Sequence, residues 1–132
     1  MIEVSAAIII ENSKVLLAKR NPDKNLGGYW EFPGGKREGN ETIFECLERE
    51  IFEELNVKCK AVEIFCENTR ENECGTIKLI AINAELIDRE IILKDHSDYE
   101  WVKISRILSY KLAPADIYIA ELLITEHNPQ PK

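Results

Sequence analysis

The sequence lacks the patterns that mark several large protein classes. Its 132 residues contain no apolar run that approaches the roughly 18 residues of a membrane-spanning helix. The first residues lack the basic stretch and apolar core of a secretory signal, so we expect a cytoplasmic protein. Acidic residues outnumber basic ones, 24 against 17, which gives a net charge of −7. That balance argues against binding to polymeric nucleic acid, which requires a basic surface.

Patterns typical of zinc sites are also missing. The four cysteines form no Cys-x-x-Cys pair and lie far apart in the sequence, at Cys46, Cys59, Cys66 and Cys74. The two histidines, His96 and His127, stand apart from them and from each other. Zinc ligands are normally closely spaced pairs, so we predict free, buried thiols instead. We interpret both histidines as structural or surface residues.

The hydrophobic pattern predicts a single α+β domain that spans residues 1–132. Apolar residues make up 45% of the chain and charged residues 31%, an ordinary balance for a globular protein. Short β-rich or apolar runs predict strands at 4–10, 15–20, 30–32, 57–68, 75–87 and 100–103. The first two strands should pair as a hairpin, and residues 69–74 should separate the strands of a longer antiparallel hairpin.

Residues 41–55 carry the clearest helical periodicity of the chain. One apolar stripe repeats at i, i+3, i+7 and i+11, through Phe44, Leu47, Ile51 and Leu55. We predict Asn40 as the N-cap and Asn56 as a C-terminal residue with positive φ. A second helix is predicted at 114–125, where Pro114 suits the first turn.

The first of these helices concentrates the acidic charge. Between positions 41 and 54 there are six glutamates and one arginine, so this short segment accounts for −5 of the −7. Glu50, Glu53 and Glu54 are spaced i, i+3 and i+4, which brings their carboxylates to one patch. Such a cluster suits a hard divalent cation such as Mg²⁺, which prefers oxygen ligands and shares them with phosphates. The simpler alternative is a solvated helix face.

The segment that precedes the helix favours an anion. Gly34 and Gly35 allow backbone amides to approach a charged group closely, and Lys36 follows them directly. A cation site beside such a loop indicates a metal-bridged diphosphate or triphosphate. The alternative is a tight turn that uses glycine only for its backbone geometry.

The spacing of these residues resembles the Nudix box. Five residues separate Gly35 from Glu41, seven more lead to Arg49 and Glu50, and the pattern then continues through Val57. The box reads Gly, five residues, Glu, seven residues, Arg-Glu, an aliphatic, any, Glu-Glu, any, Gly, an aliphatic. Only Asn56 departs from it, at the final glycine. Asparagine tolerates the left-handed conformation, so we expect the geometry to survive.

The resemblance implies a fold, a reaction and a set of ligands. The fold is the Nudix fold, a mixed β-sheet sandwiched between helices, and the reaction is hydrolysis of a nucleoside diphosphate derivative with Mg²⁺, or Mn²⁺ as an alternative. By position, the implied metal ligands are the Gly35 carbonyl and the carboxylates of Glu50, Glu53 and Glu54. Arg49 would orient a catalytic carboxylate, and Glu41 resembles the supporting acid of the box. Either a box glutamate or a later acid would accept the proton of the attacking water.

Residues outside the box are similar to those of MutT-like nucleoside triphosphate pyrophosphohydrolases. Arg20, eleven residues before Glu31, matches a position that approaches the substrate phosphates in those enzymes, and we expect Lys36 to bind substrate as well. Asp95 matches the position of a further acid at the metal centre, where the family usually has glutamate. Asp98 is the competing candidate for that role.

The stretch Leu112-Ala113-Pro114-Ala115-Asp116 resembles the base-reading segment of the same enzymes, and most closely that of the cytidine triphosphate pyrophosphohydrolase branch. Asp116 occupies the base-reading position. An ionised Asp only accepts hydrogen bonds, which suits an exocyclic amine such as cytosine N4, whereas a protonated Asp also donates. The alternative is a carboxylate that stabilises the first turn of a helix.

These features together predict an enzyme that converts a nucleoside triphosphate to the monophosphate and pyrophosphate. Its substrates would be modified nucleotides such as 8-oxo-dGTP, or (d)CTP-type nucleotides, in sanitation of the nucleotide pool. Two alternatives are a Nudix hydrolase of another derivative such as ADP-ribose, and a non-catalytic nucleotide-sensing module. The expected partner is a small nucleotide rather than a polymer or a membrane, and the chain could be a monomer or a homodimer.

Overall fold

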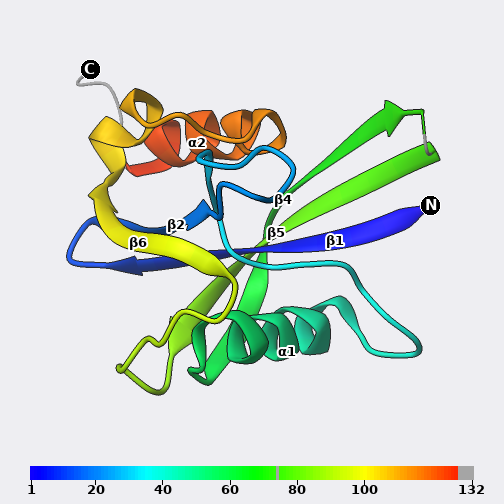
Figure 1. Cartoon of the computed structure of the whole chain (residues 1–132), viewed down its shortest axis with the longest axis horizontal. Helices are drawn as coiled ribbons and strands as arrows, with labels where there is room; N and C mark the ends of the chain where they lie inside the picture. Colours follow the sequence, from blue (N-terminus) through cyan, green and yellow to red (C-terminus); the bar gives the residue numbers. More distant parts are fainter. Residues whose placement is uncertain (74, 128–132) are drawn as a thin grey trace.

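The computed structural model describes residues 1–73 and 75–127, and it has a mixed β-sheet with a long helix on each face (Figure 1). This arrangement confirms the predicted α+β class. No helix in the described ranges is long and apolar enough to cross a membrane. The elements, in chain order, are β1 (Ile2–Glu11), β2 (Lys14–Arg20), β3 (Trp30–Glu31), α1 (Ile43–Leu55), β4 (Cys59–Asn72), β5 (Gly75–Leu86), β6 (His96–Lys103), a 3₁₀ helix η1 (Ile104–Ser109) and α2 (Pro114–His127).

The sheet divides along β1. Its strand order is β3-β2-β1-β5-β4, with β6 pairing with the other edge of β2. β1 and β2 form the predicted hairpin only next to their turn, and β1 runs parallel to β5 along most of its length. Where β2 leaves β1, residues 33–37 take its place: the N–H groups of Ser5 and Ala7 donate to the carbonyls of Gly35 and Pro33 at 2.8 and 2.7 Å. The glycine-containing loop is therefore held as part of the sheet.

Alternate residues of β1 serve two separate cores. Ile8 packs in the cluster on the α2 side and Ile9 in the cluster on the α1 side, and each is only 1% exposed. This is the burial on both faces that a continuous apolar strand predicts. The two cores fix α1 and α2 on opposite faces of the sheet (Figure 1).

The ends of α1 separate a correct prediction from a wrong one. The N-cap is Thr42, not Asn40: its side chain accepts from the Glu45 N–H at 3.0 Å, and Glu45 accepts from the Thr42 N–H at 2.8 Å. This reciprocal capping box satisfies two amides of the first turn, which one Asn side chain cannot do. Asn56 has φ 59°, as predicted, and its N–H donates to the Phe52 carbonyl.

Other boundaries differ from the sequence prediction where pairing extends a strand beyond its apolar part. β6 begins at His96 rather than at residue 100, because β2 pairs with it along its whole length. Residues 69–72, predicted as a loop, continue β4 and pair with β5. Polar side chains are tolerated there because much of this extension is exposed.

The described cysteines are free, as predicted, with Cys46 and Cys59 buried and Cys66 partly buried. Burial raises the pKa of the Cys59 thiol to about 12 and that of Cys66 to about 11, so both stay protonated at neutral pH. The prediction for Cys74 falls outside the described residues.

The left-handed residue after α1 gives a first testable prediction. Replacing Asn56 with Ala should lower the free energy of unfolding by about 1 kcal/mol, because alanine keeps the β-carbon, which is unfavourable at positive φ, but lacks the short polar side chain that lets asparagine tolerate this conformation. Asn56→Gly should unfold at the wild-type urea concentration or higher, since glycine adopts this conformation freely. Urea unfolding followed by circular dichroism measures both, and equal stability of the two variants would contradict the argument.

Candidate active site

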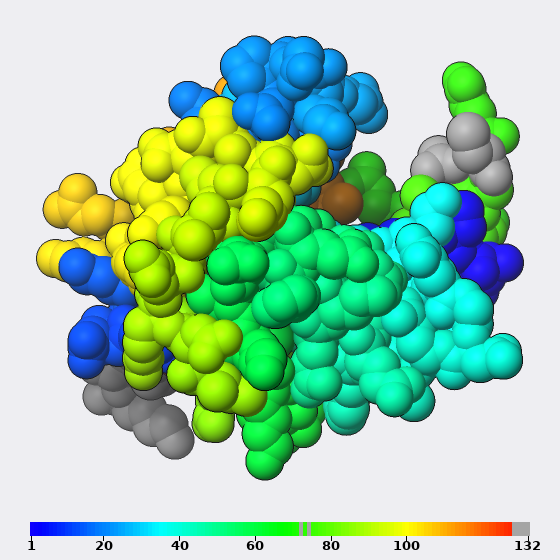
Figure 2. All heavy atoms as spheres, turned by 60° about the horizontal axis from the view of Figure 1, so that its bottom comes forward, coloured from blue at the N-terminus to red at the C-terminus, as the bar shows by residue number. Residues whose placement is uncertain are grey.

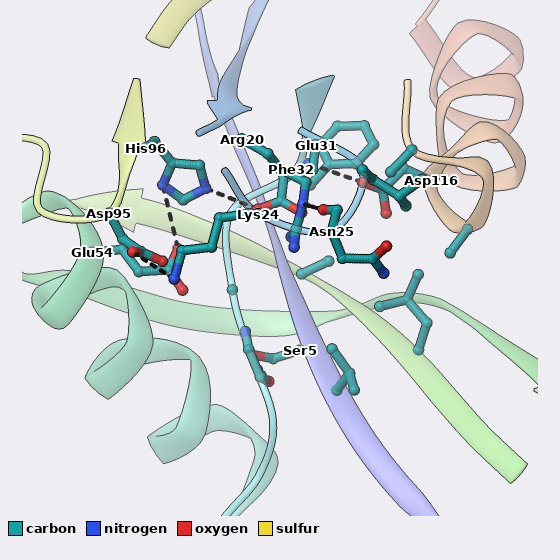
Figure 3. A pocket seen from close by; sticks show the side chains of 18 of the residues that line it. Ser5, Arg20, Lys24, Asn25, Glu31, Phe32, Glu54, Asp95, His96 and Asp116 are labelled. Carbon is teal, nitrogen blue, oxygen red and sulfur yellow. Dashed lines mark hydrogen bonds and ion pairs between the residues drawn. The ribbon is translucent and has the colours of Figure 1, made fainter. Parts of the chain in front are cut away.

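A cavity of about 350 Å³ opens (Figure 2) where β1, β2, β3, α1, β6 and the start of α2 meet. The segment between β2 and β3 covers one side of it through Asn21, Lys24 and Asn25. Figure 3 shows how the charged side chains and His96 are distributed along the cavity. His96, Glu54 and Asp95 lie toward one end, Asp116 lies toward the other, and Arg20 and Glu31 lie between them.

Glu31 is the hub of the polar groups in the cavity. One carboxylate oxygen accepts from Arg20 Nη1 at 3.0 Å, and the other lies 2.8 Å from His96 Nε2 (Figure 3). Arg20 also donates from Nε to the Asn25 carbonyl at 2.7 Å. Arg20 thus lines the cavity as predicted for a phosphate-binding residue, but two of its donors are already engaged by Glu31 and the covering loop.

Glu31 and His96 are site residues that the sequence interpretation missed. Glu31 lies three residues before Gly34, and this position at the end of a strand was an available signal. His96 was interpreted as a structural or surface residue, yet its side chain is only 4% exposed and lines the cavity. Its position follows from the unexpected early start of β6, which a strand prediction from residue 100 could not reveal.

Glu54 places its carboxyl group in the cavity, where few hydrogen-bond donors surround it and, among the described residues, no Lys or Arg pairs with it. Its Oε1 atom is buried without a hydrogen-bond partner, as is Nδ1 of His96, 3.9 Å away. Burial raises the pKa of Glu54 to about 10, and the neighbouring Glu50 and Glu31 add to the increase. A backbone N–H from Gly34 offsets only part of this effect. Ionised Glu54 therefore needs a positive group in the cavity.

Arg49 gathers the remaining acids of the box. Its guanidinium donates twice to Glu41, at 2.9 and 2.8 Å, and once each to Glu50 and Glu53, at 3.0 and 3.1 Å. These bonds hold the pKa of the Glu41 carboxyl at about 2. The same guanidinium reaches the Lys36 carbonyl at 3.1 Å and so ties the glycine loop to α1. Glu53 is 55% exposed at its side chain, outside the cavity lining.

Both glycines are closely packed, Gly34 against backbone and Gly35 against the end of a side chain. A β-carbon on Gly35 would lie 2.3 Å from Cδ of Glu50, and one on Gly34 would lie 2.1 Å from the Ser5 carbonyl oxygen. The Gly35 carbonyl, a predicted metal ligand, accepts from the Ser5 N–H at 2.8 Å and from the Cys46 thiol at 3.4 Å. Its oxygen is therefore engaged by neighbours within the protein in this structure.

The carboxylates of α1 fit a hard divalent cation by their chemistry. Within the described parts of the chain, no three His, Cys, Asp or Glu side chains converge tightly enough to form a complete metal-binding group. Glu54 nevertheless presents a buried, unpartnered oxygen, and the carboxylate of Glu50 is near enough to raise its pKa. Bringing both into the ionised state calls for a cation, and all-oxygen donors suit Mg²⁺. Glu50 and Glu54 are the residues best placed to hold it.

The structure distinguishes the two candidate acids of the 95–98 segment. Asp95 lines the cavity, where its carboxylate pairs with Lys24 at 3.3 Å (Figure 3). Asp98 is exposed, accepts from the Tyr99 N–H and does not line the cavity. Lys36, predicted to bind substrate, is likewise exposed and lies outside the lining.

Asp116 lies at the opposite end of the cavity, buried in the first turn of α2. Its Oδ2 atom accepts from the Phe32 N–H at 3.2 Å, which fixes the orientation of the carboxyl. Burial raises its pKa to about 8, and the charge of Glu31 contributes, so the neutral form dominates at pH 7. A neutral carboxyl can donate one hydrogen bond as well as accept.

The chain is similar to one protein family and to several known proteins. The model of the NUDIX domain family matches residues 1–123. The CTP pyrophosphohydrolase of Escherichia coli (strain K12) is 37% identical over 92% of this chain and 90% of its own length. The 8-oxo-dGTP diphosphatase of Proteus vulgaris is 40% identical, over 42% of this chain and 51% of its own. The solution structure of the E. coli ORF135 protein matches with a TM-score of 0.83 and 35% identity, covering 99% and 95% of the two chains.

The buried Asp116 gives a prediction for stability against pH. Between about pH 4 and pH 8 the unfolded chain has lost the Asp116 proton while the folded chain keeps it, so rising pH favours unfolding. Asp116→Asn keeps an acceptor for Phe32 and does not titrate. Across this range the wild type should lose at least ~1.4 kcal/mol of unfolding free energy relative to the variant. Urea titrations at several pH values measure this, and parallel curves for the two proteins would refute it.

Proposed function

Since this chain belongs to the Nudix family, we propose that it hydrolyses nucleoside triphosphates to the nucleoside monophosphate and pyrophosphate in sanitation of the nucleotide pool. The observation that carries the proposal is a cavity with two chemically different ends. Glu54, with a buried Oε1 atom, lies at one end, beside Glu50 of the same acidic helix. Buried Asp116 lies at the other end, where the Phe32 N–H fixes its carboxyl. The first end suits a cation and its phosphates, and the second suits the edge of a nucleobase.

At the phosphate end, the proposal assigns the metal to the carboxylates of α1. Glu50, Glu53 and Glu54 would hold Mg²⁺, with Mn²⁺ as an alternative, and the Gly35 carbonyl would join them after releasing its bonds to Ser5 and Cys46. The bound metal would supply charge neutralisation for the phosphates and a more acidic water. Glu53 is exposed and paired to Arg49, so it can turn toward the cation at little cost.

Charged residues around the carboxylates would position the substrate. Arg49 holds the carboxylates of Glu50 and Glu53 in place, which supports an orienting role in catalysis. Arg20 lines the cavity beside the expected phosphate position, whereas Lys36 would contribute from the rim. Asp95 lines the same end and would supply the further acid, once Lys24 exchanges its partner for a phosphate.

At the base end, neutral Asp116 would read the nucleotide. Its hydroxyl can donate while its other oxygen accepts, a pattern that complements cytosine N3 and N4, and also guanine O6 and N1. The relatives named CTP pyrophosphohydrolase and 8-oxo-dGTP diphosphatase fit these two bases. We therefore propose (d)CTP-type nucleotides or 8-oxo-dGTP as substrates.

The products test the reaction directly. With Mg²⁺ and dCTP or 8-oxo-dGTP, the protein should release the monophosphate and pyrophosphate. Glu54→Gln should lower kcat by about 100-fold to 1,000-fold, because a neutral amide cannot hold the metal as a carboxylate does. Glu48→Gln is the matched control on the same helix, since a Gln oxygen still accepts from the Ala61 N–H. Release of inorganic phosphate, or no turnover of any triphosphate, would refute the proposal.

Variants of Asp116 test the reading of the base. Asp116→Leu should lower kcat/KM for the preferred nucleotide by about 10-fold to 100-fold, because it removes both a donor and an acceptor. Asp116→Asn should stay within a few-fold of wild type at pH 7, since its amide also donates and accepts. Above pH 8 the KM of the wild type should rise as Asp116 ionises, while that of Asp116→Asn should not. Steady-state kinetics on both nucleotides decides this, and an unimpaired Asp116→Leu would remove Asp116 from the base site.

A further inference from the structure

A local irregularity of the sheet turns His96 into the cavity. β6 follows β2 in register from Lys103 to Asp98, which faces Lys19, but Arg20 then faces His96 and Ser97 is skipped. Such a bulge redirects the side chains beyond it. Ser97 and Asp98 are exposed as a result, whereas the ring of His96 is only 4% exposed and lines the cavity. The bulge at Ser97 therefore orients the imidazole of His96 toward the cavity.

One nitrogen of this ring is firmly anchored. Nε2 lies 2.8 Å from one oxygen of Glu31, whose other oxygen accepts from Arg20 at 3.0 Å. Arg20 in turn donates to the Asn25 carbonyl of the loop that covers the cavity. His96 is therefore connected through Glu31 and Arg20 to the loop that covers the cavity (Figure 3).

The other nitrogen points at the metal-side carboxylate without reaching it. Nδ1 of His96 and Oε1 of Glu54 are both buried and unpartnered, and in the described residues they are the two side-chain N or O atoms in that condition. They lie 3.9 Å apart, about 1 Å more than a hydrogen bond requires. A buried polar atom without a hydrogen-bond partner destabilises the folded state. A small movement of Glu54 would bring its Oε1 within hydrogen-bonding distance of His96 Nδ1.

We propose that His96 is a positioning residue that holds Glu54 Oε1 in place for metal binding and links it to the Glu31–Arg20 pair. With a proton on each ring nitrogen, His96 donates from Nε2 to Glu31 and, after a small movement of Glu54, from Nδ1 to Oε1. The inference rests on the proposed function, because Glu54 is taken as a metal ligand. Ligating carboxylates generally depend on hydrogen-bonding groups behind them, and loss of such a group weakens metal binding by about 10-fold to 100-fold. A histidine that merely filled the core would have no reason to leave Nδ1 unpaired beside an unpaired carboxylate.

Two amide substitutions separate the ends of the ring. The amide nitrogen of Gln stands as many bonds from Cβ as Nε2, so His96→Gln can keep the bond to Glu31 but loses the group at Nδ1. The amide of Asn corresponds to Nδ1, so His96→Asn keeps a polar group facing Glu54 and loses the bond to Glu31. The matched control is His127→Gln, because His127 is exposed at the end of α2 and lies outside this cavity.

Mn²⁺ binding to the full chain without nucleotide, measured by the electron paramagnetic resonance of free Mn²⁺, is the primary readout. His96→Gln should bind Mn²⁺ about 10-fold to 100-fold more weakly than wild type, and His96→Asn should stay within a few-fold. Wild-type affinity in His96→Gln, or equal weakening in both variants, would overturn the proposal. His127→Gln should bind as wild type does.

A measurement on the unaltered protein covers the case in which a variant does not fold. In wild type with ¹⁵N-labelled histidine, saturating Mg²⁺ should shift the Nδ1 resonance of His96 and leave both nitrogens of His127 unmoved. No shift at His96 would overturn the proposal. Failure of the proposed function would be recognised separately, because wild-type protein would then release no pyrophosphate from any triphosphate.

Discussion

Arg49 supplies the single positive charge among the six glutamates of residues 41–54, and its guanidinium donates to three of them. The planar fork of arginine allows this, because it offers five donors in fixed directions. By also reaching the Lys36 carbonyl, Arg49 joins the glycine loop to α1. The loop is in turn hydrogen-bonded along β1, so Arg49 adds a polar link to the apolar packing that holds α1 on the sheet.

Arg49 does not bond to Glu54, whose Oε1 atom stays without a hydrogen-bond partner. The charges in the rest of the cavity act on this carboxyl as well. The negative charge of Glu31 raises the pKa of Glu54 at one end and of Asp116 at the other. Arg20 partly offsets the effect at Asp116 and also binds Glu31 directly. A change in the charge at Glu31 would therefore alter the pKa of an acid at each end of the cavity, although the two acids occupy separate elements.

Sequence spacing was sufficient for the parts of the site that lie on one regular element. The periodicity of α1 and the spacing of the box placed Glu50, Glu53 and Glu54 on one helix, and Asn56 took the left-handed conformation expected of it. Thr42 and Asn40 are both good capping residues, and only the reciprocal pairing of Thr42 with Glu45 decides between them. His96 could not be found in this way, because its direction depends on a bulge opposite β2 that leaves no periodic signal.

The net charge of −7 and an anionic substrate are compatible for a reason visible only in the cavity. Arg20 and Lys24 are the cationic side chains that line it, and each is already paired with a carboxylate, Glu31 and Asp95 respectively. A phosphate that entered without a metal would be repelled by the carboxylates of the cavity, because Arg20 and Lys24 are already paired with carboxylates. A divalent cation from solution removes that repulsion and satisfies Glu54 at the same time. Metal and nucleotide should thus favour each other's binding, since each supplies the charge that the other lacks.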